Sequence, residues 1–342
     1  MAWGILTGVR PTKLAMKKLE EGMESEAFVS WFRQTYLVSE EKARLAWEIA
    51  GREKKLLDRL DYEDGYSLYV GIPFCPTVCT YCSFSSGALE DWKDFVDAYV
   101  EALCKELAFI GEVSKEKKLN SIYIGGGTPT SLNARQLERI LSCIDTHFSR
   151  EYLLEYTVEA GRPDSITEEK LQVIKAHKVT RISINPQTMQ QRTLDLIGRR
   201  HSVEQTVESF KIARELGFDD INMDLIMGLP EESLEDVRDT LEQIMQLKPD
   251  NLTVHSLALK RAARLNMFKE DYKDYVKAAF YEAVKLCAYL CKEHNIATNK
   301  VISHCEGGEA GIASRHGDPD HWFTQYGLTM DYFRTCVDKI RG

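Results

Sequence analysis

Short apolar, β-branched runs alternate with longer helical patterns between Tyr66 and Asn266. Six runs have the composition of strands: YSLYVGI, SIYIGG, LEYTVEA, RISIN, DINMDLI and NLTVHSL. The segments between them have apolar residues at helical spacing: DWKDFVDAYVEALCKELAFI, ARQLERILSCIDTHF, EEKLQVIKAH, VEQTVESFKIARELG and SLEDVRDTLEQIMQL. Each begins with, or directly follows, a Ser, Asp, Asn or Thr, residues that cap helices. The alternation predicts an α/β fold with a parallel sheet and helices on one face, either an open wound sheet or a partial (β/α)6 barrel.

The pattern changes on both sides of this region. Residues 1–65 are rich in Lys, Glu, Ala and Leu at helical spacing, and after about Asn266 a helix, a loop dense in Gly, His and Asp, and a last helix follow. We therefore predict three parts: an N-terminal helical segment (1–65), an α/β core (66–266) and a small helical and loop appendage (267–342). In such a core the active site lies at the carboxyl ends of the strands.

Composition and charge narrow the expected location and partners. The formal net charge of -9 gives no electrostatic reason to expect nucleic acid or an anionic membrane as a partner. No apolar stretch is long enough to span a membrane, and the first residues lack the pattern of a signal peptide. We expect a cytoplasmic protein, in which the nine cysteines are metal ligands or buried thiols rather than a disulfide framework.

Cys75, Cys79 and Cys82 follow the first expected strand in the segment GIPFCPTVCTYCSF. Three thiolates at this spacing can hold three corners of a [4Fe-4S] cluster and leave the fourth iron open, whereas an electron-transfer cluster takes four cysteines. The amino and carboxylate groups of S-adenosylmethionine (SAM) can chelate an open iron. The alternatives are a zinc site, for which no fourth Cys or His lies nearby in the sequence, or three unrelated buried thiols.

A glycine run ends the second expected strand, in IYIGGGTPT. Gly125, Gly126 and Gly127 allow the backbone to approach a ligand closely, and exposed backbone groups with the hydroxyl of Thr128 can grip the amino-acid end of SAM. The alternative is a tight strand-to-helix turn, which needs only one or two glycines.

Five ordered motifs carry a resemblance to a known family: YVGIPFCPTVCTYC, YIGGGTPTSL, TVEAGRPDSIT, SINPQTM and DINMDLIMGLP. Over residues 1–266 the chain resembles the radical SAM family of oxygen-independent coproporphyrinogen III oxidases (dehydrogenases) and their heme-chaperone-like relatives. WGILTGVRPTKL and EAGRPD resemble the HemZ-type branch. The resemblance implies a radical SAM barrel, a [4Fe-4S] cluster and SAM as cofactors, a porphyrinogen as small-molecule substrate, and an electron donor such as flavodoxin or ferredoxin.

The resemblance also implies a set of SAM contacts. By its motifs these are Tyr69, Tyr81, Gly126, Gly127, Thr128, Glu159, Gln187, Arg199 and Asp224. Asp224 lies inside an apolar run, where a carboxylate is costly to bury without a partner. Arg199, in GRRH, is equally compatible with a solvated surface position. Phe84 stands where relatives that act on porphyrinogens often carry a further cysteine, which does not ligate the cluster in the resemblance.

The reaction implied is oxidative decarboxylation of coproporphyrinogen III to protoporphyrinogen IX, a step of heme biosynthesis. Arg261 and Arg264 could pair with substrate propionates, although a solvated helix face is the alternative. The alternative functions are a heme chaperone that keeps the cluster and SAM, and a catalytically impaired fusion with a non-functional amidase remnant.

The residues from about 268 onward resemble a different family. AVKLCAYLCKEHNI, VISHCEGGEAGIASRHGDPDHWF and TMDYFRTCVDKI are similar to the C-terminal half of N-acetylmuramoyl-L-alanine amidases. This second resemblance implies His304 and Asp318 as zinc ligands. A catalytic zinc site needs three protein ligands, so we expect both residues to be non-functional remnants.

Overall fold

The computed structural model describes residues 2–6, 10–257, 272–293, 295, 297–298, 301 and 328–341. The chain divides into two compact units, residues 1–78 with 84–257, and residues 79–83 with the described part of 258–342. The boundaries expected at residues 66 and 267 stay predictions. Arg261, Arg264, His304 and Asp318 lie outside the described residues.

Three helices near the N-terminus have a hydrophobic core of their own. They are α1 (Pro11–Glu20), α2 (Ser25–Tyr36) and α3 (Glu40–Leu57). Phe28 and Phe32 of α2 are fully buried, as are the alanines that α3 places at positions 43, 46 and 50. The spacing of these alanines at three and four residues puts them on one face of α3, so the small side chains let the helices pack closely.

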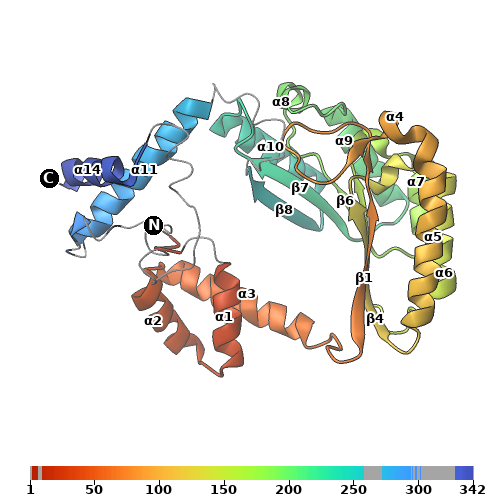
Figure 1. Cartoon of the computed structure of the whole chain (residues 1–342), viewed down its shortest axis with the longest axis horizontal. Coiled ribbons are helices and arrows are strands. Elements are labelled where there is room, and N and C mark those ends of the chain that lie inside the picture. The colour runs from red at the N-terminus through yellow and green to blue at the C-terminus, as the bar shows by residue number, and fades with distance from the viewer. Residues whose placement is uncertain are drawn as a thin grey trace. The chain divides into compact units, whose positions relative to one another are not determined.

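The six expected strands are present and form one parallel sheet. They are β1 (Gly65–Ile72), β4 (Lys118–Gly126), β5 (Glu155–Gly161), β6 (Arg181–Ile184), β7 (Ile221–Met227) and β8 (Asn251–Ser256). The strands lie side by side in chain order, with β1 and β8 at the two edges (Figure 1). The predicted partial (β/α)6 barrel of a radical SAM fold is confirmed, and all six strands end at one rim because every pair is parallel.

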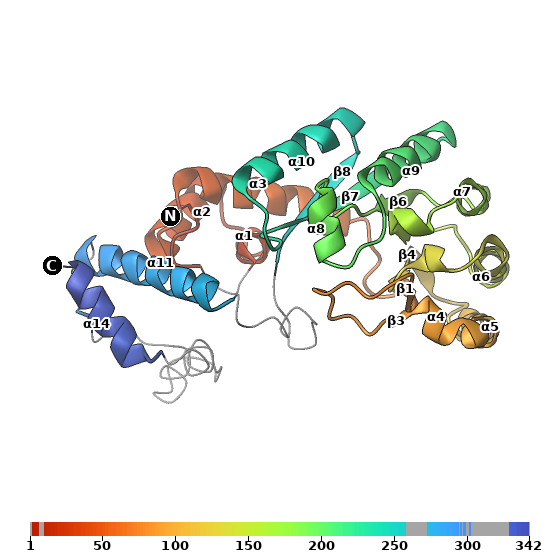
Figure 2. The same cartoon turned by 90° about the horizontal axis from the view of Figure 1, so that it is seen from above.

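Helices cover one face of this sheet. They are α5 (Val96–Val113), α6 (Ala134–His147), α7 (Glu168–Ala176), α9 (Val203–Glu215) and α10 (Leu234–Leu247), and they follow the outer side of the strands in Figure 2. Side chains of Asn133, Thr167, Ser202 and Ser233 cap the last four, as the sequence predicts. The helix expected over 91–110 is broken, because α4 (Leu89–Trp92) and a 3-10 turn precede α5.

The two faces of the sheet differ in polarity. Ile122, Val158 and Leu225 belong to the hydrophobic core between strands and helices. Residues one position away along the strands, such as Glu159 and Asp224, point to the opposite, inner face because side chains alternate along a strand. The inner face therefore carries the polar groups, and it is the face on which a ligand can be held.

The second unit contains two described helices, α11 (Tyr272–Glu293) and α14 (Met330–Arg341). Phe280 and Val284 of α11 pack in one cluster with Phe333 and Val337 of α14. Within the described ranges, no helix is long and apolar enough to cross a membrane.

Candidate functional site

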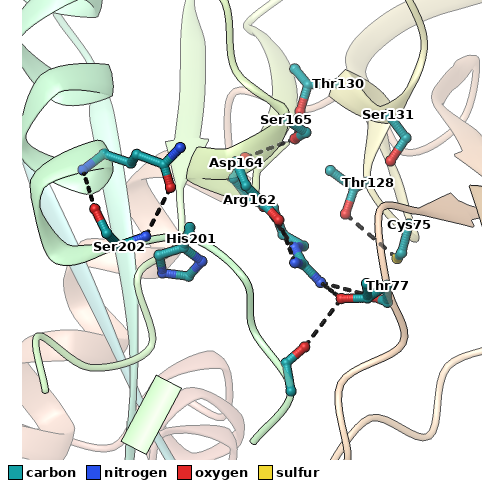
Figure 3. Close-up of polar contacts among 12 residues, drawn as sticks. Cys75, Thr77, Thr128, Thr130, Ser131, Arg162, Asp164, Ser165, His201 and Ser202 are labelled. Atoms are coloured by element: carbon teal, nitrogen blue, oxygen red, sulfur yellow. Dashed lines mark hydrogen bonds and ion pairs between the residues drawn. The ribbon is translucent and has the colours of Figure 1, made fainter. Parts of the chain in front are cut away.

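Hydrogen bonds from Thr128, the residue after the glycine run, hold Cys75 at the rim of the barrel. Cys75 ends β2 (Phe74–Cys75), which pairs with β3 (Gly87–Ala88). The Thr128 amide donates to the Phe74 carbonyl at 2.7 Å, and its hydroxyl donates to Cys75 Sγ at 3.5 Å (Figure 3). A Cβ added at Gly127 would lie 3.0 Å from that sulfur, so glycine keeps the space beside the thiol open.

Cys79 and Cys82 lie in the segment 79–83, which belongs to the second compact unit. The Cys82 amide donates to the Cys79 carbonyl at 3.2 Å, which makes a turn, and Tyr81 lies inside it. Neither Cys79 nor Cys82 forms a disulfide bond. In the part of the chain that the structure describes, no three His, Cys, Asp or Glu side chains are gathered as a metal site. Joint ligation by the triad is therefore a proposal.

A cavity of about 380 Å³ opens beside the ends of β1, β4 and β5. Its lining includes three of the expected SAM contacts, Tyr69, Gly126 and Glu159. The other lining residues are Gly71, Ile72, Pro73, Phe84, Ser85 and Tyr99. Phe84 thus lines this cavity. It is the residue at which the sequence differs from relatives that act on porphyrinogens.

Glu159 is the carboxylate of this cavity. Tyr123 donates a hydrogen bond to it, and the Tyr123 ring stacks on Tyr69 with centroids 5.9 Å apart. Burial raises the pKa of the Glu159 carboxyl above its ordinary value, while the Tyr123 hydrogen bond acts in the opposite direction. A cationic ligand group beside Glu159 would favour its ionised form. The site therefore fits a ligand with an ammonium group, such as SAM.

Asp224 belongs to a polar network on the inner face of the barrel. Asn222 donates to Asp224 at 2.7 Å and to Ser183 at 2.9 Å, and His255 Nε2 lies 3.8 Å from the Asp224 carboxylate. These contacts supply the partners that a carboxylate inside an apolar strand needs. The backbone amide of Gln187 donates a hydrogen bond to the backbone carbonyl of Asp224 at 2.9 Å.

The side-chain oxygen of Gln187 is buried and has no hydrogen-bond partner, and its backbone has a φ of 71°. A non-glycine residue in this left-handed region is strained, and a buried unpaired amide oxygen costs free energy. A bound ligand with a hydroxyl or ammonium donor would satisfy it. Gln187 thus fits a role in ligand binding, although it does not line the cavity beside Glu159.

Arg199 is buried, with 4% of its surface exposed, which excludes the solvated alternative. It follows α8 (Gln191–Leu196), a short helix that the sequence does not predict. Arg162, His201 and Arg199 all interact electrostatically with Asp164, and the two guanidinium groups lower the pKa of its carboxyl, so these side chains lie together (Figure 3 shows Arg162, Asp164 and His201). Arg199 does not line the cavity, and its assignment as a SAM contact stays a prediction.

Several residues of the site are missed by motif reasoning. Tyr123 lies two positions before Gly125, and Asn222 lies two positions before Asp224. Because residues two apart on a strand share a face, this spacing could have identified both. Arg162 could not be found in this way, since its partner Thr77 is 85 residues away in the chain.

The sequence matches the radical SAM superfamily over residues 69–244. It is 42% identical over 296 residues to the oxygen-independent coproporphyrinogen-III oxidase-like protein HemZ of Bacillus subtilis. The aligned region covers 85% of this chain and 59% of that protein. It is 38% identical over 194 residues to the heme chaperone HemW of Lactococcus lactis, covering 57% of this chain and 49% of that protein. The chain thus spans between about half and three fifths of these relatives' length.

Among solved structures, the coproporphyrinogen III oxidase HemN of Escherichia coli, described as a radical SAM enzyme, matches with a TM-score of 0.53 and 26% identity. The match covers 66% of this chain and 56% of that one. The open space beside Cys75, the Glu159 carboxylate and the unsatisfied Gln187 oxygen fit the superfamily's cofactors. The chain belongs to the radical SAM superfamily, whose cofactors are a [4Fe-4S] cluster and SAM.

Proposed function

We propose that this protein converts propionate side chains of coproporphyrinogen III to the vinyl groups of protoporphyrinogen IX without oxygen. The observation that carries the proposal is the relative named as coproporphyrinogen-III oxidase-like, which aligns with 85% of this chain. The cavity beside Glu159 supports the radical-generating half of the reaction, since it offers a carboxylate and open glycine backbone to SAM.

We propose that Cys75, Cys79 and Cys82 hold the cluster and leave one iron for SAM. Tyr69, Gly126 and Glu159 would hold the SAM amino group and neighbouring atoms in the cavity. The proposed set is completed by Tyr81, Gly127, Thr128, Gln187, Arg199 and Asp224. When bound, the cluster and SAM supply a 5'-deoxyadenosyl radical, and a donor such as flavodoxin or ferredoxin would provide the electron.

The protein's own part in the reaction is to bind, orient and exclude water. Glu159 offers a carboxylate to an ammonium group, and Asp224, held by Asn222, offers one to a ribose diol. In the proposed reaction a propionate would lose one hydrogen atom from its β-carbon to the radical that the cofactors supply. Loss of CO2 and transfer of one electron to an acceptor would then leave the vinyl group.

The second candidate function is that of a heme chaperone that keeps both cofactors and does not decarboxylate. The observation that favours it is the similarity to HemW, at 38% identity over 57% of the chain. The two functions share the cluster and SAM and differ in the molecule that enters the barrel.

Anaerobic product analysis separates the two candidates. The protein is reconstituted with iron and sulfide, reduced, and incubated with SAM and coproporphyrinogen III, and the tetrapyrroles are separated by chromatography and mass. We expect vinyl-bearing product together with 5'-deoxyadenosine. Heme binding in the absence of any decarboxylated product would contradict the proposal and support the chaperone.

A further inference from the structure

Two consecutive strands of the barrel end in the same short motif. The sequences GTPTS (127–131) and GRPDS (161–165) follow β4 and β5, and in each a 3-10 turn begins at the proline. The residue before each proline, Thr128 or Arg162, has an extended backbone, as a following proline requires. Both side chains reach the segment that starts at Cys75: Thr128 contacts Cys75, and Arg162 contacts Thr77 (Figure 3).

Arg162 is held from one side by Asp164. Its Nε and Nη2 donate to the two carboxylate oxygens at 2.9 and 2.5 Å. The Arg162 side chain is 4% exposed and that of Asp164 13%, so the pair is shielded from water. A buried guanidinium is tolerated only when it is paired and hydrogen-bonded, and a two-point contact with a carboxylate fixes its plane as well as its charge.

The remaining nitrogen, Nη1, points at Thr77. It donates to the Thr77 carbonyl at 2.8 Å and to the Thr77 hydroxyl at 2.7 Å. That hydroxyl in turn donates to the Gly198 carbonyl at 3.1 Å, next to Arg199. Thr77 lies between Cys75 and Cys79 in the sequence, so the guanidinium fixes the backbone between two proposed cluster ligands and joins it to the segment that carries Arg199.

We infer that Arg162 is a positioning residue for the cluster-binding loop, acting through Thr77. The inference rests on the proposed ligand set of Cys75, Cys79 and Cys82. Without the guanidinium, the Thr77 carbonyl and hydroxyl lose their buried partner, and the loop between the first two cysteines samples other shapes. In metalloproteins, removing a group that hydrogen-bonds a metal ligand lowers metal affinity about 10- to 100-fold. Arg162 contacts the backbone between two proposed ligands and not a ligand itself, so we expect an effect at the lower end of that range.

The test compares Arg162→Gln with a matched control, Arg214→Gln. Arg214 also pairs with an aspartate, Asp250 at 2.7 Å, and donates to two backbone carbonyls, of Phe218 and Lys248, at 2.9 and 3.0 Å. These carbonyls precede β7 and β8, so Arg214 lies at the end of the barrel away from the cysteines. Its loss removes the same kind of interaction without touching the loop.

Each protein is reconstituted anaerobically, and two properties are measured: the rate of iron release to a chelator and the electron paramagnetic resonance spectrum of the reduced cluster. We expect Arg162→Gln to release iron about tenfold faster than wild type, with an altered spectrum, and Arg214→Gln to behave as wild type in both. Equal release rates and spectra for the two variants would overturn the inference.

A second variant, Thr77→Val, tests the inference even if Arg162→Gln does not fold. Thr77→Val removes the hydroxyl and keeps the carbonyl, so it should accelerate iron release less than Arg162→Gln does. If Arg162→Gln is unfolded by circular dichroism, a wild-type release rate and spectrum for Thr77→Val overturn the inference. If wild type itself binds no cluster, the proposed ligand set fails instead, which separates the two failures.

Discussion

His201 shows how strongly the environment of one residue departs from what its sequence position suggests. It is fully buried near Arg199, Asp164 and Arg162. Burial, followed by the positive charge of Arg199, lowers the pKa of its imidazole to about 3. The ring is therefore neutral in the folded protein at neutral and mildly acidic pH. No motif predicts this, because it depends on groups that only the fold brings together.

The neutral His201 predicts a loss of stability in mild acid. The unfolded chain takes up a proton on this imidazole near pH 6.5, whereas the folded chain does so only near pH 3, so the free energy of unfolding decreases as the pH falls between these values. From pH 7 to pH 5 the contribution is about 2 kcal/mol. Urea unfolding of apo wild type and His201→Asn at both pH values measures it.

We expect His201→Asn to lose about 2 kcal/mol less than wild type over this interval, since asparagine does not titrate. All other titrating groups are common to the two proteins and cancel in the comparison. The same pH dependence in both proteins would show that the imidazole titrates alike in the folded and unfolded chains.

At the scale of elements, hydrophobic periodicity was enough to predict the sheet. The six strands and the helices α6, α7, α9 and α10 occur where the alternation places them, because a strand buried against helices needs a run of apolar residues. The helix expected over 91–110 becomes α5 only from Val96, after α4 and a 3-10 turn. The pair β2 and β3 was not predictable, since each has two residues and no periodic pattern. Cys75 is the last residue of β2, so a strand that the sequence pattern did not predict belongs to the proposed cluster site.

Gly126, in the glycine run, lies where the end of β4 comes close to the backbone of β1. Gly126 has a φ of 107°, and a Cβ there would lie 2.9 Å from the Ile72 amide nitrogen. We expect Gly126→Ala to lower the free energy of unfolding of the apo protein by about 1–3 kcal/mol. Gly51, inside α3 with open space around it, is the control, and Gly51→Ala should raise stability by about 0.5–1 kcal/mol.

Thermal unfolding of the two alanine variants against wild type measures both effects. Opposite shifts in melting temperature are expected. A Gly126→Ala protein that is as stable as wild type would mean that the end of β4 can relax without its glycine, and the close approach of β4 to β1 would then not require one.

For the whole molecule, sequence motifs predicted the family and the barrel but not the assembly of the site. The ordered motifs predicted the radical SAM superfamily, and the match over residues 69–244 shows it. The contact between Arg162 and Thr77 joins positions 85 residues apart, which no local pattern encodes. The motifs do not identify the substrate, because relatives similar in sequence to this chain are named both as coproporphyrinogen oxidases and as heme chaperones.

The central claim is that Cys75, Cys79 and Cys82 hold a four-iron cluster that cleaves SAM. It is tested by anaerobic reconstitution followed by electron paramagnetic resonance with and without SAM, and by measurement of 5'-deoxyadenosine. Cys104→Ala, which changes a cysteine of α5, is the matched control. We predict that wild type and Cys104→Ala show a four-iron signal that SAM alters and release 5'-deoxyadenosine, whereas Cys79→Ala does neither. A wild type without a four-iron cluster, or a Cys79→Ala protein that cleaves SAM as well as wild type, would contradict the claim.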